Sequence, residues 1–595
     1  MKLSRYCSLI LLNLVVCASA VTAQQETPQI AKNIGDQRTT PAVTSASIGS
    51  TPSNLNRVGV QTGQPLPLSL NDAVQRALEN NNDIEVSRGD VRFQETQVRS
   101  LLGVYDPVFS VSPNFSRSNT TGSPATKDFR VNANISQFIE RGGGNYQAFF
   151  NNQRTENAFA QAQVSSGSVG NNSSAIYSSS AGINYTQPLA RNFRVDSRRH
   201  SITIARKRLE QTDSDFRLRA TETITGVQRA YWDFVFALRN QQNQVANVNL
   251  AKENLRQVEA KIDAGSAAPL ERAEVATELA NREGDLLLAT QSVSIAENTL
   301  KQFVLRDPLS VEWSQTFVPT DKPAFSLDPV SLDGAMKDAM DNRFELKRLK
   351  LQKEINSEDI KFYKNQIKPQ IDLNTTFSLD GLARSGTNSA TTTNLYTSTA
   401  DLRLFNAINQ IRALPTVNLP PILNDGIVIP ASPSFLFGGF NRSLANIFRS
   451  DAPNFSVGVT ISFPFRNRTA KANLDGARVQ EVQLSAQTRG QEQSVIVEVR
   501  NAVQAVETTR QRVLTARRAR ENAEIQLEGE RKLYEVGRST TFLLFQRENA
   551  LTNARNAEIR AETDYNKSLA DLQRATSTAF RANNVQVSSP VPLPK

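Results

Sequence analysis

The residue types that most often carry chemistry in proteins are nearly missing from this chain. Its 595 residues include one histidine, His200, and two cysteines, Cys7 and Cys17. Transition-metal sites and histidine-based acid–base sites need more of these side chains, and the sequence has no phosphate loop, nucleophile elbow or HExxH motif. Carboxylate pairs are so frequent that they single out no position. We therefore predict no catalytic, cofactor or metal site and no enzyme activity, and we expect His200, beside Arg198 and Arg199, to lie on the surface.

The first residues have the pattern of a secretory signal peptide. Lys2 and Arg5 are basic, an apolar run follows over 9–16, and small residues within 18–23 offer two cleavage sites. The apolar run is too short to span a bilayer as a helix. We therefore predict that residues 1–23 are removed and that the mature chain is exported.

Both cysteines lie inside this segment. Its cleavage would leave the mature chain without disulfides, thiolate ligands or cysteine nucleophiles. The alternative is that Cys17 carries a lipid. The residues before it, Leu14, Val15 and Val16, lack the small side chain that lipid-attachment sites place there, which favours simple cleavage.

The chain is basic, with a formal net charge of +10. Such a charge can indicate a nucleic-acid partner, but here the basic residues are spread among acidic ones on helix-like segments without interleaved aromatic residues. A solvated helix surface is the better interpretation, and we expect no nucleic acid. No later stretch reaches the roughly 18 apolar residues of a membrane helix, so a membrane crossing would require β-strands.

Two parts of the chain repeat one sequence pattern. LNDAVQRALENNNDIE, from Leu70, aligns without gaps with LDGAMKDAMDNRFELK, from Leu332. GVQRA, from Gly226, aligns in the same way with EVRNA, from Glu498, and this second alignment places Gly265 opposite Gly537. Internal similarity of this kind indicates two copies of one structural unit.

The repeat divides the chain into six regions. A Gln-, Thr-, Ser- and Pro-rich composition predicts disorder in the segment before the first copy. The predicted regions are a signal peptide (1–23), a disordered linker (24–67), a first repeat (68–305), an inter-repeat linker (306–330), a second repeat (331–578) and a C-terminal tail (579–595).

Each copy is expected to contain a helix, strands, a very long helix, a glycine break and another helix. The predicted first helices cover 70–104 and 332–366, with Ser69 and Asp333 as cap residues. The predicted long helices cover 198–263 and 469–536. Small or apolar residues seven apart form a narrow coiled-coil-like seam on them, at Val248, Leu255 and Ile262, with Ala251 and Val258 beside it, and at Val499, Val506 and Val513.

Helix lengths indicate how these elements pack. A helix of about 67 residues extends roughly 100 Å at about 1.5 Å per residue. The two shorter helices of each copy together have nearly this length, so they can stack end to end beside the long helix.

Four segments have the alternating pattern of a strand with one apolar face. They begin near 107, 178, 371 and 454, and an extra hairpin over 129–152 would add two more. FSVGVTISF, from Phe455, alternates without a fault, as membrane β-barrel strands do. A half-buried strand of a soluble sheet is the alternative for any single segment. Four to six strands cannot close a membrane barrel, which needs at least about eight. If these strands cross a membrane, several chains must therefore share one barrel; three chains with about four strands each would give twelve.

The duplicated opening, the strand exits TQPLARNF and SFPFRN, and the turns AGSAAPLERAEV and VGRSTTFLLFQRENALTNAR together resemble the TolC-like outer-membrane efflux proteins. The resemblance covers about 68 to 578. It implies an α+β membrane protein with two internal repeats, in which a trimeric transmembrane β-barrel continues into a periplasmic α-helical barrel.

The resemblance also implies a function and partners. The protein would be a passive exit duct of a tripartite efflux or type I secretion system, located in the outer membrane and extending into the periplasm. Its implied partners are two further copies of itself, outer-membrane lipid, a periplasmic adaptor protein and an inner-membrane transporter. A secreted coiled-coil scaffold or stalk is the alternative, against which the strands between the helices argue.

The two glycine breaks are then the periplasmic tips, where such ducts close and where adaptors bind. Glycine just past a helix end allows the left-handed backbone that reverses the chain. Glu271 matches an acidic tip position of the family, and Arg538 lies beside the position of a pairing basic residue. The predicted tip, gate and adaptor-contact residues are Gly265, Ser266, Leu270, Glu271, Tyr534, Gly537, Arg538, Ser539, Phe542, Leu543, Phe545 and Gln546.

The second tip departs from the family pattern. Two acidic positions are lost where this chain has Leu543, Leu544, Phe545 and Gln546. An apolar constriction is therefore one hypothesis for this cluster, and simple packing between helix pairs is the other.

The second strand pair is interrupted by a long insert over 380–453. It is rich in Thr, Ser, Asn and Pro and includes LFGGFNRSLANIF. Because it lies between an outward and a returning strand, we predict an extracellular loop.

Overall fold

The computed structural model describes residues 61–592, except for 123–124, 157–174, 267, 387–389, 395, 397 and 432. The predicted signal peptide, Cys17 and the predicted linker up to residue 60 lie outside the described residues. Among the residues that are described, no helix is both long enough and apolar enough to span a membrane.

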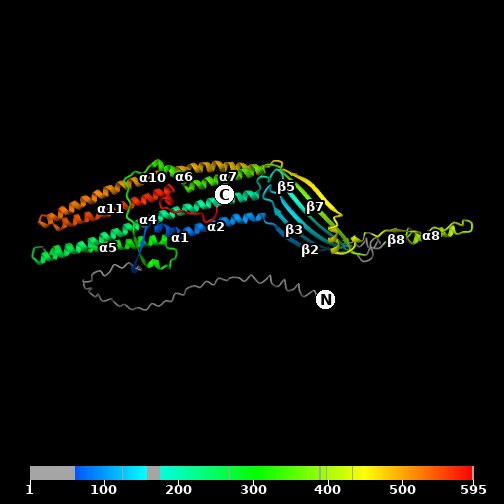
Figure 1. Ribbon diagram of the computed structural model, residues 1–595, viewed down its shortest axis with the longest axis horizontal. Coiled ribbons are helices and arrows are strands. Elements are labelled where there is room, and N and C mark those ends of the chain that lie inside the picture. Colours follow the sequence, from blue (N-terminus) through cyan, green and yellow to red (C-terminus); the bar gives the residue numbers. More distant parts are fainter. Residues whose placement is uncertain are drawn as a thin grey trace, which may run out of the picture. The chain divides into compact units, whose positions relative to one another are not determined.

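Two helices of unusual length dominate the fold (Figure 1). They are α4 (Ser197–Asp263) and α10 (Arg468–Glu535), and each turns into a shorter helix, α5 (Pro269–Val304) or α11 (Thr541–Ala575). The predicted bounds of the long helices are correct to within one residue.

The predicted seam on the long helices is largely buried. Val248, Ala251 and Val258 of α4 are at most 6% exposed. Val499, Val506 and Val513 of α10 are at most 1% exposed. Leu255 and Ile262 are only half-buried, so the seam loosens toward the turn.

Each predicted first helix is two helices, not one. The first pair is α1 (Leu70–Asn80) and α2 (Asn82–Leu102), and the second is α6 (Leu332–Asn342) and α7 (Phe344–Gln366). Asn81 and Arg343, at equivalent positions of the sequence repeat, interrupt the helices with ψ of 128° and 125°. The amphipathic pattern continues across both positions, so periodicity alone could not locate the break.

The helix caps were predicted correctly in one case. The Ser69 hydroxyl accepts a hydrogen bond from the Asp72 amide and caps α1. The prediction for Asp333 is wrong: Ser331 caps α6 by accepting from the Gly334 amide, and Asp333 lies inside the first turn. There a carboxylate still interacts favourably with the helix dipole.

Contacts between helices define two rows. Near the sheet the order across the layer is α2, α4, α7, α10; away from the sheet it is α5, α4, α11, α10. The predicted stacking is therefore confirmed: α2 and α5 share α4, and α7 and α11 share α10. The column of α2 and α5 forms one side of the layer, and α10 forms the other.

Six of the described strands form one sheet, in the order β10-β7-β5-β4-β3-β2, and every neighbouring pair is antiparallel. The count of about four strands per chain is wrong, because the hairpin near 129–152 lies inside the sheet, between β2 and β5. Positive φ at Gly142 and Gly143 closes this hairpin. The strands are β2 (Val108–Ser118), β3 (Thr126–Phe138), β4 (Asn145–Glu156), β5 (Ala175–Pro188), β7 (Gln370–Arg384) and β10 (Pro453–Ser462).

The sheet has one apolar and one polar face. Its register aligns one apolar row across all six strands, made of Phe109, Ile135, Ala148, Ile183, Phe377 and Phe455. The neighbouring row points to the other face and is mostly polar: Ser110, Asn134, Phe149, Gly182, Ser378 and Asn454. The apolar face is exposed, so it is not the inner face of a soluble domain.

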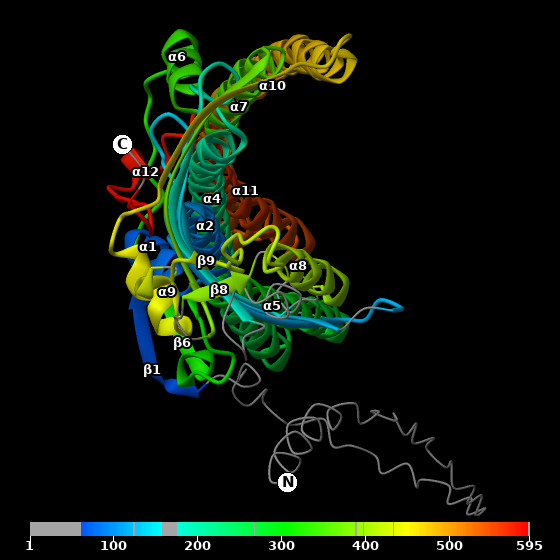
Figure 2. The same ribbon diagram turned by 90° about the vertical axis from the view of Figure 1, so that its right-hand side faces the viewer.

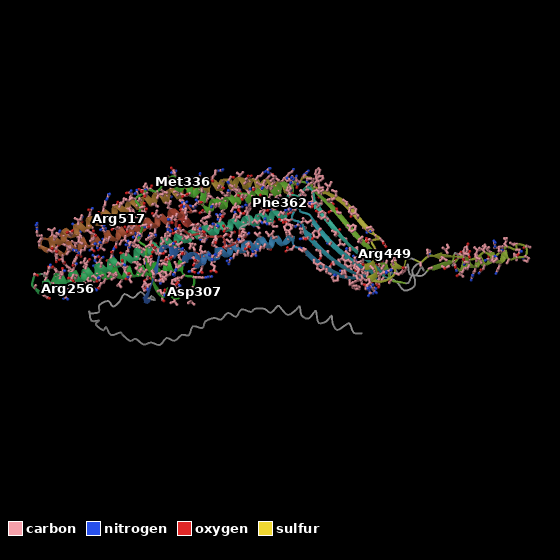
Figure 3. All side chains as sticks on the ribbon, viewed as in Figure 1. Arg256, Asp307, Met336, Phe362, Arg449 and Arg517 are labelled. Carbon is pink, nitrogen blue, oxygen red and sulfur yellow. The ribbon has the colours of Figure 1, made fainter. Side chains whose placement is uncertain are left out.

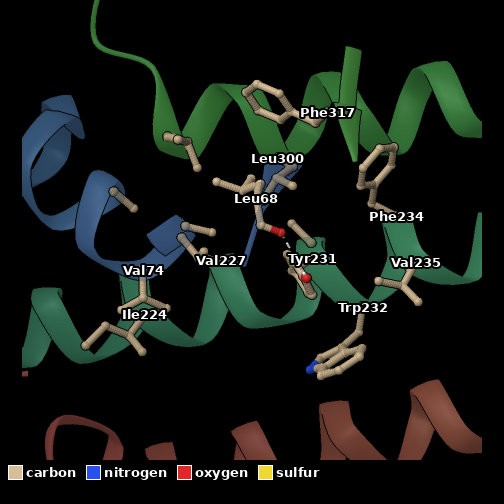
Figure 4. Close-up of a cluster of buried hydrophobic side chains, with 14 of the residues drawn as sticks. Leu68, Val74, Ile224, Val227, Tyr231, Trp232, Phe234, Val235, Leu300 and Phe317 are labelled. Atoms are coloured by element: carbon tan, nitrogen blue, oxygen red, sulfur yellow. Dashed lines mark hydrogen bonds between the residues drawn. The ribbon is translucent and has the colours of Figure 1, made fainter. Parts of the chain in front are cut away.

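A buried cluster joins the N-terminal strand and the inter-repeat segment to α4 (Figure 4). β1 (Gln61–Leu68) pairs in parallel with β6 (Gln315–Pro319), and the Tyr231 hydroxyl donates to the Leu68 carbonyl at 3.2 Å. Residues 61–67 are therefore a strand, and the prediction of disorder fails there because Leu68 and Phe317 are almost fully buried in this cluster.

The predicted inter-repeat linker and the predicted C-terminal tail also contain structure. The inter-repeat segment includes β6 and a short 3-10 helix, Val311–Ser314. The tail begins with α12 (Ala579–Ala582), and Ala579 and Val591 are buried against the helices.

The insert holds a small hairpin and two helices. Thr391–Asn394 (β8) pairs with Gly426–Ile429 (β9), and α8 (Thr399–Arg412) lies between them. After a 3-10 turn at Ser434–Leu436, α9 (Phe440–Ile447) contacts β5 and β7.

Candidate functional site

The two turns that join the helix pairs have the same backbone geometry. Gly265 and Gly537 have φ of +73° and +72°. At each turn the glycine amide bonds back three residues and the next amide bonds back five, from Ser266 to Lys261 and from Arg538 to Leu533, both at 2.8 Å. These are Schellman motifs, in which a glycine in the left-handed conformation satisfies the last helix carbonyls.

The described residues around the first turn are mostly exposed to solvent. Pro269 begins α5, and the Glu271 carboxylate accepts from the Ala268 amide at 3.5 Å. Glu271 is thus partly used as a helix cap, while Leu270 beside it is 71% exposed.

The second tip is more tightly bonded. Thr540 caps α11 by accepting from the Leu543 amide, and the Ser539 hydroxyl donates to the Glu530 carboxylate. The Arg538 side chain and Gln546 are exposed. Arg538 forms no salt bridge among the described residues.

The apolar cluster of the second tip is divided between two environments. Leu544 is 7% exposed and packs with Ala523, Leu527 and Leu551. Phe542 and Leu543 are 71% and 39% exposed. Neither hypothesis therefore fits the whole cluster, because one residue packs inside the helix pair while two others project from it.

Polar contacts connect the two helix pairs. At the tip, the Lys261 ammonium of α4 donates to the Tyr534 hydroxyl at 3.1 Å and lies 4.3 Å from the centre of its ring. The Asn254 amide of α4 donates to the Glu548 carboxylate of α11 at 3.3 Å. Tyr534 was predicted as a tip residue, but its partner Lys261 was not.

Glu548 is a buried acid at this junction. It is 9% exposed, and Arg531 lies 3.7 Å away. Burial raises the pKa of the Glu548 carboxyl, and the nearby Arg531 and Arg282 charges and the Asn254 hydrogen bond oppose this only in part.

A groove of about 540 Å³ separates the helix pairs at this level. It is lined by Leu250, Glu253, Asn254, Gln257, Val258, Lys261, Arg531, Tyr534, Glu535, Thr541, Leu544, Phe545 and Glu548. Phe545 therefore faces the groove, which distinguishes it from exposed Leu543.

The sequence did contain a signal for this junction. Glu548, Thr552 and Asn556 recur every four residues on α11 and so share one face. Thr552 donates to Asn247 at 3.1 Å, and Asn243 donates to Asn556 at 2.9 Å. A polar stripe on a helix that is otherwise expected to pack indicates such a seam.

The prediction for His200 is wrong. Its side chain is 12% exposed, its Nε2 lies 2.8 Å from Asp359, and its ring stacks on Phe362 at 4.3 Å. His200 therefore joins α4 to α7, a contact that depends on which helices become neighbours.

Both sides of this structure expose an edge strand and apolar side chains of the helices next to it. Every residue of β2 and of β10 is exposed. The helices that continue these two sides carry exposed apolar side chains, at Val86 and Phe93 of α2, Leu287, Leu288 and Ile295 of α5, and Val479, Val482, Val497 and Ile525 of α10.

Solved structures with this fold are outer-membrane channels. The chain superimposes on CusC with a TM-score of 0.55 at 14% identity, covering 85% of this chain and 91% of that chain. For the Campylobacter jejuni CmeC channel the TM-score is 0.53 at 14% identity, with 87% and 90% covered. For the open state of the Neisseria gonorrhoeae MtrE channel it is 0.53 at 15% identity, with 85% and 88% covered. The chain therefore shares its fold with these three channels.

The sequence shows the family to which the chain belongs. A family model described as outer membrane efflux protein matches residues 73–304 and 436–578. These segments make up more than half of the chain, so the chain belongs to this family and is an outer-membrane protein with the TolC-like fold. A search of curated proteins found no significant match.

Proposed function

We propose that three copies of this chain form an exit duct that crosses the outer membrane and continues into the periplasm. The observation that supports this most strongly is the pair of open edges. Unpaired strands with exposed apolar residues are an aggregation hazard unless another strand covers them, and an open sheet edge cannot face lipid.

Pairing between copies of the chain would cover both open edges of the sheet, with the antiparallel strand direction found in the rest of the sheet. β2 runs away from the helices and β10 runs toward them, so β10 of one copy and β2 of the next would pair antiparallel, as all the other strands of the sheet do. Three copies of a six-stranded sheet give eighteen strands, an even number within the range of outer-membrane barrels. The same closure would cover the apolar side chains on α2, α5 and α10.

The proposed duct is a passive conduit of a tripartite efflux or type I secretion system. Its adaptor and inner-membrane pump would meet the tips, at exposed residues of both turns such as Leu270 and Arg538. A transporter must supply the energy for export, because the proposed duct is a passive conduit.

We further propose that exposed Phe542 and Leu543 narrow the tunnel, whereas Leu544 holds the helix pair together. Leu543→Ala should raise the single-channel conductance in planar bilayers, because a smaller side chain widens an apolar constriction. Phe545→Ala is the matched control, since Phe545 faces the groove between helix pairs. Equal conductance of Leu543→Ala and the parent protein would contradict the gate.

The assembly itself is tested by unheated gel electrophoresis of detergent-extracted outer membranes. A heat-modifiable band of three chains is expected. An elongated protein recovered as a monomer or dimer outside the membrane fraction would instead support the scaffold alternative.

A further inference from the structure

α9 lies on the apolar face of the sheet, at the end away from the helices. The Ser443 hydroxyl oxygen is 2.7 Å from the Ser179 hydroxyl of β5 and 2.9 Å from the Gly381 carbonyl of β7. Ser179 and Gly381 are paired and lie four residues from Ile183 and Phe377 on their strands, so they point to the apolar face. Figure 2 shows α9 on the convex side of the curved sheet.

The helix covers a gap in that face. Asn152, Ser179 and Gly381 form a row without an apolar side chain, whereas Phe115 and Phe129 keep the outer ends of β2 and β3 apolar. The Asn152 amide donates to Ser179. A Cβ at Gly381 would lie 2.1 Å from the Ser443 carbonyl oxygen, so the close approach of α9 depends on this glycine.

The outward side of α9 replaces the missing apolar surface. Phe440, Leu444 and Phe448 recur every four residues and lie on one flank, and Phe440 and Phe448 are 40% and 81% exposed. Arg442 lies on the other flank, and Arg449 follows in the turn after α9, where its guanidinium also pairs with Asp451 at 2.7 Å.

The basic flank faces the outer end of the sheet. The Arg442 guanidinium donates to the Phe435 carbonyl at 3.2 Å, and the Arg449 guanidinium lies 4.0 Å from the centre of the Phe435 ring. Two residues later, Phe437 bridges to Arg384, the last residue of β7. Figure 3 places Arg449 at the end of the sheet opposite the helices.

We propose that α9 is an interfacial helix that binds phosphate-bearing lipid of the outer leaflet. An apolar flank beside the apolar belt and a basic flank beyond it are what a helix needs to lie at a membrane surface, and aromatic residues are favoured at that depth. The arginines fit anionic phosphate groups. This inference rests on the proposed function, because the sheet must cross the membrane for α9 to meet lipid.

The depth of α9 can be measured by tryptophan quenching. Phe448→Trp, Phe455→Trp on the apolar belt and Leu270→Trp at the exposed tip are each reconstituted in vesicles of brominated phosphatidylglycerol, and the signal of the parent protein, with its Trp232 and Trp313, is subtracted. Trp at 448 and at 455 should be quenched several-fold more than Trp at 270. Quenching at 455 but not at 448 would overturn the lipid contact of α9 and leave the membrane crossing of the sheet in place. Quenching at neither position would overturn both.

The role of the arginines has its own test in the Phe448→Trp background. Quenching should be stronger in brominated phosphatidylglycerol than in brominated phosphatidylcholine. Arg442→Ala with Arg449→Ala should remove this difference, and the matched double lysine variant should keep it. Equal quenching in the two lipids before any arginine is changed would overturn the phosphate preference.

Discussion

At the scale of single residues, Gly265 and Gly537 act through backbone conformation rather than through side-chain packing. A Cβ added at Gly265 or Gly537 would meet no atom within 4 Å. The cost of any substitution there therefore comes from the left-handed backbone alone. Glycine at both turns was predictable from the sequence because no other residue adopts this conformation so readily.

Gly537→Ala should destabilise the second tip by about 1 kcal/mol, because the left-handed backbone costs a residue with a Cβ about that much. Hydrogen exchange of the amides around residues 530–545 measures the change. Gly529→Ala is the matched control: Gly529 lies in the interior of α10 with open space around it. Alanine should stabilise the helix there by up to about 1 kcal/mol. The same sign for both variants would contradict the assigned backbone role.

Glu548 should make the junction between the helix pairs sensitive to pH. A carboxyl whose pKa is raised by folding holds its proton more tightly in the folded state. The folded junction is therefore favoured at low pH and loses stability as pH rises from the ordinary carboxyl range through the raised pKa. Exchange protection of α11, corrected for intrinsic rates, should fall over that range.

Glu548→Gln should remove this dependence, since the amide keeps the shape of the acid but does not ionise. Glu528→Gln, at an exposed position of α10, is the control and should leave the pH dependence of α11 protection in place. An unchanged pH profile in Glu548→Gln would exclude Glu548 as the titrating group.

At the scale of elements, the sequence predicted what depends on local pattern and missed what depends on neighbours. The long helices, the glycine turns and the alternating strands follow from periodicity and turn residues. The breaks at Asn81 and Arg343 occur without glycine or proline and could not be located in this way. The partners of Glu548 and His200 come from other helices, so only the packed layer reveals them.

Arg343 shows how one break is held in place. Its guanidinium, 5% exposed, lies 2.7 Å from Glu498 of α10 and 2.9 Å from Glu345. It also donates to the carbonyl of Ala575, the last residue of α11, at 2.9 Å. One side chain thus joins the break between α6 and α7 to both helices of the second pair.

Arg343→Ala should lower the stability of this region by about 2 kcal/mol, because the Ala575 carbonyl and the half-buried Glu345 lose a charged donor, whereas Glu498 keeps Arg574 at 2.6 Å. A shift of the thermal unfolding midpoint measures the loss. Arg348→Ala, on α7, is the matched control, because its exposed pair with Asp215 should contribute less than about 1 kcal/mol. Equal shifts would mean that Arg343 is not a structural link.

At the scale of the whole molecule, the described chain presents two exposed sides that complement each other. One consists of β2 with α2 and α5, and the other of β10 with α10. Family membership predicts the channel, but the count of six strands comes from the structure, which places the hairpin of β3 and β4 inside the sheet. The proposed duct is consequently wider than the twelve strands expected from the sequence.

The most direct test of the shared barrel is a disulfide between its edges. Ser456 of β10 and, in three separate variants, Ser110, Ser112 or Asn114 of β2 are changed to cysteine in the mature chain, where the predicted cleavage leaves no other cysteine. All four positions lie on the polar face, and the three variants sample the strand register between copies. Oxidation in native membranes followed by denaturing electrophoresis should give a ladder that stops at three chains for at least one variant. Monomer alone in all three variants, or a ladder that continues past three, would contradict a closed trimeric duct.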